Sequence, residues 1–223
     1  MDKVMAKINE STLRIIDNPV ILQNLCIMRD KNTDSQGVRI ATRHITRILL
    51  YETSKCLPLV EKTINTPLAA CKTKTIDPDI NIIISPILRA GLIFTDEAID
   101  ILPQACIRHI GMYRDEKTLK PVWYYNKVPM EVQDPHKLHI FITDPMLATG
   151  NSLIEVIKLY ADKNVPLENI KVISIISAPE GVSNIQTKFP QVEIITAALD
   201  SHLNEQGYIV PGMGDAGDRI FNT

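Results

Sequence analysis

The chain has 223 residues, of which 45% are hydrophobic and 22% are charged. These are ordinary values for a globular protein, and they exclude disordered, collagen-like and coiled-coil classes. The formal net charge of −2 supplies no overall attraction to nucleic acid or to an anionic membrane. Because this length lies near the upper end of single-domain sizes, we expect one domain over residues 1–223.

The four cysteines show neither metal-binding nor redox spacing, so we expect buried thiols in a reducing compartment. The start of the chain, MDKVMAKINE, lacks the apolar run of a signal peptide. No stretch approaches the roughly 18 apolar residues of a transmembrane helix. We therefore predict a cytoplasmic protein with no membrane or nucleic-acid partner.

Residues 37–50 have the pattern of an amphipathic helix. Three arginines, Arg39, Arg43 and Arg47, recur four residues apart on one of its faces. Arginine stripes of this kind are usually solvated surface, and we assign this one no function. The apolar face of the helix is formed by Val38, Ala41, Ile45, Ile48 and Leu49.

From residue 80 onward, short β-branched runs alternate with stretches long enough for crossover helices. This alternation predicts an α/β fold with a mostly parallel sheet that is buried on both faces. Ligands of such open sheets bind beyond the carboxyl ends of the strands. The predicted strands lie at 80–84, 105–112, 138–143, 171–177 and 192–198, and the predicted helices at 91–101, 152–163 and 180–188.

Two segments depart from this alternation. Residues 113–130 are polar and aromatic and contain Pro121 and Pro129, which suggests a hairpin arm. The tail from Gln206 is rich in glycine, which predicts an irregular loop.

The strongest local signal for chemistry is the stretch LHIFITDPMLATGNSLIEVIKLY. A buried strand ends at Asp144, a loop of small residues follows, and a helix begins near Ser152. Backbone N–H groups, the helix N-terminus and the Thr149 hydroxyl can together hold a phosphate monoester. Asp144 can accept hydrogen bonds from two adjacent sugar hydroxyls. The alternative is an ordinary turn with a helix cap at Asn151 or Ser152.

Further signals lie at the ends of other predicted strands. Arg89 in SPILRAG and Arg114 in GMYR offer planar donors that suit a pyrophosphate, although each could be an ordinary surface arginine. The loop YIVPGMGDAGD at 208–218 exposes backbone groups that can match the O2, N3–H and O4 edge of uracil. Cytosine would mismatch that edge at two positions. The spacing alone does not prove this assignment.

These segments, in this order and with APEG at 178–181, resemble the uracil phosphoribosyltransferases, a subgroup of the type I phosphoribosyltransferases. The similarity runs from NPVILQNLCIMRDKNT at 18–33 to the C-terminus. This family converts uracil and 5-phosphoribosyl-1-pyrophosphate (PRPP) to uridine monophosphate (UMP) and pyrophosphate, with magnesium, in pyrimidine salvage. The resemblance implies a parallel sheet flanked by helices, a small hood that includes a base-binding loop at about 200–223, a β-hairpin arm at about 113–130, and homodimers or homotetramers.

The resemblance also implies site residues. Arg89 and Arg114 would meet the pyrophosphate, Asp144 the ribose and Asp215 the PRPP edge, and these four are the candidate catalytic residues. Magnesium would be held mainly through PRPP, with no protein ligand assigned. The wider PRPP site would comprise Arg89, Arg114, Asp144, Pro145, Met146, Leu147, Ala148, Thr149, Gly150, Asn151, Ser152 and Asp215. The uracil site would comprise Ile209, Gly214, Asp215 and Ala216.

The sequence departs from the family pattern at Asn151, and it leaves open the effector and two rival functions. Asn151 stands where the family usually has glycine; asparagine tolerates left-handed backbone geometry, but its side chain lies beside the phosphate and is a reason to expect weaker PRPP affinity. GTP, which activates some members, is a candidate effector with no residue assigned to it. The rival functions are the same transfer to another base, such as hypoxanthine or adenine, and a non-catalytic module that senses PRPP or nucleotides.

Overall fold

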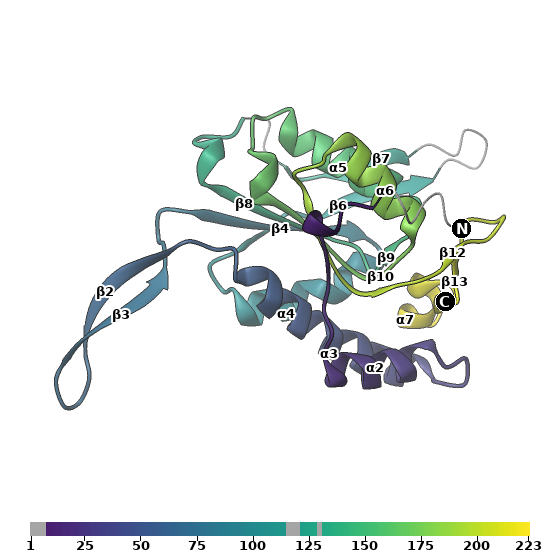
Figure 1. Cartoon of the computed structure of the whole chain (residues 1–223), viewed down its shortest axis with the longest axis horizontal. Coiled ribbons are helices and arrows are strands. Elements are labelled where there is room, and N and C mark those ends of the chain that lie inside the picture. Colours follow the sequence, from purple (N-terminus) through teal and green to yellow (C-terminus); the bar gives the residue numbers. More distant parts are fainter. Residues whose placement is uncertain (1–7, 115–120, 129–130) are drawn as a thin grey trace.

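The computed structural model describes residues 8–114, 121–128 and 131–223 (Figure 1). Its helices, with η marking the 3-10 type, are η1 Glu10–Thr12, α2 Pro19–Arg29, α3 Ser35–Ser54, η2 Ala90–Phe94, α4 Thr95–Ile101, η3 Pro135–Lys137, α5 Asn151–Ala161, η4 Leu167–Asn169, α6 Pro179–Lys188 and α7 Ala216–Phe221. Its strands are β1 Leu13–Ile15, β2 Leu59–Asn65, β3 Ala70–Ile76, β4 Asn81–Leu88, β5 Cys106–Ile107, β6 Ile110–Arg114, β7 Pro121–Asn126, β8 Leu138–Thr143, β9 Met146–Leu147, β10 Ile170–Ser177, β11 Glu193–Leu199, β12 His202–Leu203 and β13 Ile209–Val210.

Within these residues the main sheet has nine strands, in the order β1-β11-β10-β8-β4-β6-β7, with β5 beside β4 and β9 beside β10. All of its pairs are parallel except β6 and β7. The predicted parallel sheet is therefore confirmed. The run at 105–112 forms two strands, β5 and β6, and each of the other predicted runs forms one.

Helices cover both faces of the sheet, as the apolar strands require (Figure 1). The side chains of β8 show the division, since Phe141 joins the core under α2, α3, α4 and α7, whereas Ile140 and Ile142 join the core under α5 and α6. Successive residues of a strand point to opposite faces, so one short run contributes to both cores.

The chain order places a topological switch point between β4 and β8. From β4 the chain continues to β6 and β7 on one side, and after β8 it continues to β10 and β11 on the other. The carboxyl ends of these two strands lead directly to Arg89 and Asp144. Ligands of open parallel sheets bind at such a point, so the topology brings two of the sequence-predicted residues to one edge.

Two antiparallel hairpins extend the fold. In the predicted arm at 113–130, β6 and β7 form an antiparallel pair, but this pair is the edge of the main sheet. Residues 115–120 and 129–130 of the predicted arm lie outside the described part. The second hairpin, β2 with β3, was not predicted from the sequence. It forms a separate sheet that projects from the body of the protein (Figure 1).

Three further expectations need correction. The glycine-rich tail is more ordered than predicted, because it contains β13, which pairs with β12, and the short helix α7. The cysteines are free, as expected, but all four are exposed rather than buried. The helix predicted at 37–50 is longer, because Asp34 caps it by accepting a 2.7 Å hydrogen bond from the Gly37 N–H.

No helix in the described ranges is both long and apolar enough to cross a bilayer.

Candidate active site

The loop after β8 encloses a small cavity at the carboxyl edge of the sheet. The cavity has a volume of about 110 Å³, which suits a compact group such as a phosphate. Pro145 and Leu147 do not line it but are buried beneath it, and the Pro145 carbonyl accepts a 3.0 Å hydrogen bond from the Ile175 N–H. Some residues of the predicted loop therefore line the cavity, and others support it from beneath. The lining residues are Asp144, Met146, Ala148, Thr149, Gly150, Asn151, Ser152 and Leu153.

The N-terminus of α5 adjoins this loop, and its N-cap residue supplies no side-chain hydrogen bond, although the Asn151 N–H donates a long 3.5 Å hydrogen bond to Oγ1 of Thr149. Gly150 precedes the helix with φ of +79°, and it has no side chain that could accept a hydrogen bond from the first N–H groups of the helix. Unpaired N–H groups at a helix N-terminus attract anions. Asn151 is the first helical residue, so the left-handed geometry belongs to Gly150, and tolerance of that geometry is not the reason asparagine fits at 151.

Asp144 lies at the tip of β8, largely surrounded by protein. Burial raises the pKa of its carboxyl group to about 7, although a 3.4 Å hydrogen bond from the Met146 N–H favours the ionised form. A carboxylate that titrates near neutral pH is typical of functional sites. It can accept hydrogen bonds from ligand hydroxyls when ionised.

The two predicted arginines leave neighbouring strands at the same edge. Arg89 follows β4 directly and is exposed, and its backbone carbonyl accepts a 3.0 Å hydrogen bond from the Leu92 N–H at the start of η2. Arg114 is the last residue of β6, which pairs in parallel with β4. The side chain of Arg114 lies outside the described part of the structure.

The predicted base loop lies beside the end of β11. Ile209 and Ala216 are buried, whereas Gly214 and Asp215 are exposed. One oxygen of Asp215 caps α7 by accepting a 2.9 Å hydrogen bond from the Asp218 N–H. Asp215 therefore has a structural role, as the N-cap of α7.

The APEG segment at 178–181 links two parts of the site. One is the loop of residues 144–152, which we call the phosphate loop after its predicted ligand, and the other is residues 200–223, which we call the hood. A Cβ atom added to Gly181 would lie 2.3 Å from the Ala148 carbonyl oxygen, so α6 packs directly on the loop. Asn184 donates a 3.0 Å hydrogen bond to the Thr149 carbonyl. Glu180 accepts a 3.0 Å hydrogen bond from the Leu203 N–H in β12. The start of α6 thus holds both parts of the site.

Comparison with known proteins identifies the family. A family model described as uracil phosphoribosyltransferase matches residues 15–223. The chain belongs to the uracil phosphoribosyltransferase family. A protein of that name from Dictyoglomus thermophilum is 46% identical over 209 residues, covering 94% of this chain and 98% of that one. Another, from Lactococcus lactis subsp. cremoris, is 44% identical over 213 residues, covering 96% and 99%.

Solved structures show the same fold. The AQ2163 protein from Aquifex aeolicus superposes with a TM-score of 0.83 at 32% identity, covering 94% of this chain and 97% of that one. An adenine phosphoribosyl transferase from Trypanosoma brucei has a TM-score of 0.54 at 12% identity, covering 92% and 88%. This second likeness shows that the uracil phosphoribosyltransferase family shares its fold with a transferase for another base.

The arginine stripe of α3 is not simply solvated surface, contrary to the expectation from sequence. Arg43 and Arg47 both donate to the carboxylate of Glu97 in α4, whose side chain is 0% exposed. Burial alone would raise the pKa of Glu97, but the hydrogen bonds from the two arginines outweigh it and lower the pKa. Sequence analysis missed Glu97, since no local pattern marks it.

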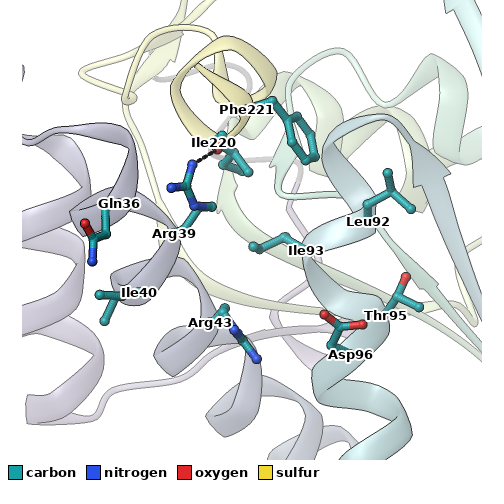
Figure 2. A pocket seen from close by; sticks show the side chains of 10 residues that line it. All are labelled: Gln36, Arg39, Ile40, Arg43, Leu92, Ile93, Thr95, Asp96, Ile220 and Phe221. Carbon is teal, nitrogen blue, oxygen red and sulfur yellow. Dashed lines mark hydrogen bonds between the residues drawn. The ribbon is translucent and has the colours of Figure 1, made fainter. Parts of the chain in front are cut away.

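Arg39 completes the stripe by donating a 2.9 Å hydrogen bond to the Ile220 carbonyl in α7 (Figure 2). A cleft of about 450 Å³ separates α3 from η2, α4 and α7, and Figure 2 shows Arg39 and Arg43 on its α3 wall. Thus α3 is joined to α4, which follows the Arg89 segment, and to α7, which follows the base loop.

Proposed function

We propose that the protein transfers the phosphoribosyl group of PRPP to uracil and yields UMP and pyrophosphate. The observation that carries this proposal is the cavity formed by the loop Asp144–Ser152, in a chain that belongs to the uracil phosphoribosyltransferase family over residues 15–223. The relatives from D. thermophilum and L. lactis bear the name of that activity.

In this proposal the loop holds the ribose 5-phosphate portion of PRPP. The phosphate occupies the 110 Å³ cavity, where it accepts hydrogen bonds from the uncapped N–H groups of α5 and from the hydroxyls of Thr149 and Ser152. The Asp144 carboxylate accepts hydrogen bonds from the two ribose hydroxyls. Its position at the end of β8, beside the first loop residues, supports this role.

Arg89 and Arg114 are proposed to bind the pyrophosphate. Arg89 follows β4 and Arg114 ends β6, the strand that pairs with β4, and the Arg89 side chain has no hydrogen bond or ion pair within the described residues. As the bond to the anomeric carbon breaks, negative charge grows on the departing pyrophosphate. Guanidinium groups fixed beside it stabilise that charge more in the transition state than in the ground state.

A magnesium ion would fit this site as a companion of PRPP. Mg²⁺ keeps several waters and usually takes one or two carboxylates together with substrate phosphates, and Asp144 offers one carboxylate beside the cavity. When bound, the ion would offset charge on the pyrophosphate. We propose that it is held mainly by PRPP oxygens.

The base would bind at Ile209 and Gly214–Ala216. Backbone groups of this exposed loop can pair with the O2, N3–H and O4 edge of uracil, and the buried Ile209 supports the loop from below. Two routes for removing the uracil proton remain: Asp215 as a general base, or stabilisation of the uracil anion by backbone N–H groups. Holding the two substrates in line supplies much of the remaining rate.

We also propose a homo-oligomer in a reducing, cytoplasmic compartment. The β2–β3 hairpin projects from the body of the protein (Figure 1). It supports self-association, because it exposes Leu59, Ile64 and Leu68, with Leu68 96% exposed. The four free cysteines suit a reducing compartment. GTP stays a candidate effector without assigned residues.

The test is conversion of radiolabelled uracil with PRPP and magnesium, with cytosine and hypoxanthine assayed in parallel. We expect UMP from uracil and only trace nucleotide from the other bases. Conversion of another base instead would overturn the base assignment. A protein that binds PRPP in calorimetry but converts no base would be a sensing module and not a transferase.

A further inference from the structure

The base loop is attached to an ion pair whose members lie far away in the sequence. Arg29 is the last residue of α2, and Asp200 follows β11. Nη1 of Arg29 lies 2.8 Å from Oδ2 of Asp200, and Nη2 lies 2.6 Å from Oδ1. The Asp200 side chain is 5% exposed and that of Arg29 is 24% exposed. Two parallel charge-assisted bonds in a largely buried setting fix both side chains in orientation.

Both side chains also bind the backbone of Gly212, inside the base loop. Arg29 Nη1 donates a 2.9 Å hydrogen bond to the Gly212 carbonyl, and the Gly212 N–H donates a 2.8 Å bond to Oδ2 of Asp200. A Cβ atom added at Gly212 would lie 2.2 Å from the Ile209 carbonyl oxygen. The loop is therefore folded tightly onto itself at Gly212, the residue that the ion pair holds. Gly212 lies in the sequence between Ile209 and Gly214, two residues of the predicted uracil site.

A second arginine secures the other end of the loop to the same support. Arg219 in α7 donates hydrogen bonds of 2.6 Å to the Met28 carbonyl and 3.0 Å to the Met213 carbonyl. It also donates a 2.6 Å bond to the Asp30 carbonyl. The C-terminal end of α2 is thus the anchor for the whole base loop.

We propose that Arg29 and Asp200 are positioning residues that determine base specificity. This inference rests on the proposed function, because it takes the base to be recognised by backbone groups of the loop. Hydrogen bonds depend steeply on distance and angle, so a shift of the backbone weakens binding of the correct base. It also weakens rejection of the wrong base, which depends on polar groups left unpaired. Both side chains of the pair contact the loop directly, at Gly212.

The experiment compares the wild-type protein with Asp200→Asn and Arg29→Lys. Asparagine keeps one acceptor for the Gly212 N–H but loses the charge, and lysine keeps the charge but loses the two-bond geometry. For each protein, kcat and KM are measured for uracil and for PRPP, together with the ratio of kcat/KM for uracil over cytosine. Thermal unfolding is recorded alongside, as a separate measure of stability.

We expect KM for uracil to rise about tenfold in Asp200→Asn, which corresponds to about 1.4 kcal/mol of lost binding free energy, because the loop loses a charge-assisted bond. The uracil-over-cytosine ratio should fall. KM for PRPP should stay within about twofold, because in the described part of the chain the side-chain hydrogen bonds of the pair reach Gly212 and none reaches residues 144–152. Arg29→Lys should shift the same constants by a smaller factor.

Glu193→Gln is the matched control. Glu193 stands at the amino end of β11, forms a 3.6 Å ion pair with Arg14, and lies at the other end of the strand from Asp200. We expect it to leave both KM values unchanged.

Three outcomes would count against the inference. Equal rises of both KM values in Asp200→Asn, or a lower unfolding temperature with unchanged KM for uracil, would overturn it. If Asp200→Asn does not fold, Arg29→Lys decides, and an unchanged KM for uracil and an unchanged ratio would be contrary to it. A wild-type protein that converts no uracil would remove the proposed function, whereas an active wild type with these outcomes would remove this inference alone.

Discussion

The phosphate loop and the base loop occupy one edge of the sheet but are built differently. The phosphate loop is continuous from the end of β8 to the start of α5, and its turn is set locally by Gly150. The base loop is held by contacts that span the chain, such as that between Arg29 and Gly212. A phosphate can be bound by one strand–loop–helix unit. In the proposed function, a flat base needs backbone groups held in fixed positions, and distant residues such as Arg29 hold this loop.

The largest effects on activity should follow from substitutions at the end of β4 and at the start of the phosphate loop. We expect Asp144→Ala and Arg89→Ala each to lower kcat/KM for PRPP by roughly 10²–10³-fold, as loss of a preorganised charge-stabilising group does. Steady-state kinetics would show this. Lys158→Ala, on the exposed face of α5, is the control and should stay near wild type. Losses below about fivefold in both variants would contradict the proposed site.

The Arg89 segment has its own distant support, and Glu97→Gln tests it. The change removes the buried charge that Arg43 and Arg47 share, so we expect a loss of roughly 1–3 kcal/mol in stability. It should also raise KM for PRPP a few-fold while KM for uracil is kept. Differential scanning fluorimetry and kinetics measure the two effects. Asp100→Asn is the control, since Asp100 is exposed and 3.8 Å from Arg47; an equal effect there would exclude a specific role for Glu97.

The stability of the protein should depend on pH through Asp144 in the phosphate loop, because the pKa of its carboxyl group is about 7. The unfolded carboxyl ionises near its ordinary pKa of about 3.9, so the folded protein binds more protons between these values. The contribution of Asp144 to the free energy of unfolding is therefore fully present below about pH 4, where the carboxyl group is protonated. It is lost as the pH rises from about 4 through about 7.

Asp144→Asn removes this dependence. We expect its unfolding temperature to exceed that of the wild type at pH 8, by roughly 2–4 °C for each kcal/mol gained, with a difference that shrinks toward pH 4. Melting curves across this range are the measurement. A difference that is constant with pH would mean that the Asp144 pKa is not raised.

The smallest effect should come from Asn151, the departure from the usual glycine. Its side chain lines the phosphate cavity at the first residue of α5. Asn151→Gly should lower KM for PRPP by about two- to threefold, because it removes a side chain beside the phosphate, at a helix cost of up to about 1 kcal/mol. Kinetics with PRPP as the varied substrate measure it. A higher KM would show that the asparagine contributes to binding.

The same contrast explains how much the sequence could predict. The strand runs and the loop Asp144–Ser152 are local patterns, so the parallel sheet could be predicted and the loop that lines the cavity could be singled out. The partners of Glu97 and Asp200 depend on contacts across the fold, and no short pattern marks them. The β2–β3 hairpin was missed because its strands carry alternating polar residues on an exposed ribbon and resemble loop sequence.

A matched pair of glycines allows the central claim, that two separately built regions bind the two substrates, to be tested. Gly150 and Gly214 have nearly the same φ, +79° and +80°, so alanine imposes a similar φ strain of about 1–2 kcal/mol at each. At Gly150 the added Cβ would also lie 3.0 Å from the Gly181 carbonyl oxygen, whereas at Gly214 its nearest neighbour would be Cδ of Arg219 at 3.9 Å. KM for PRPP and KM for uracil should be measured in Gly150→Ala and Gly214→Ala. We expect the first variant to raise only KM for PRPP and the second only KM for uracil. If both variants raise the same constant, the two regions do not divide the substrates and the account is wrong.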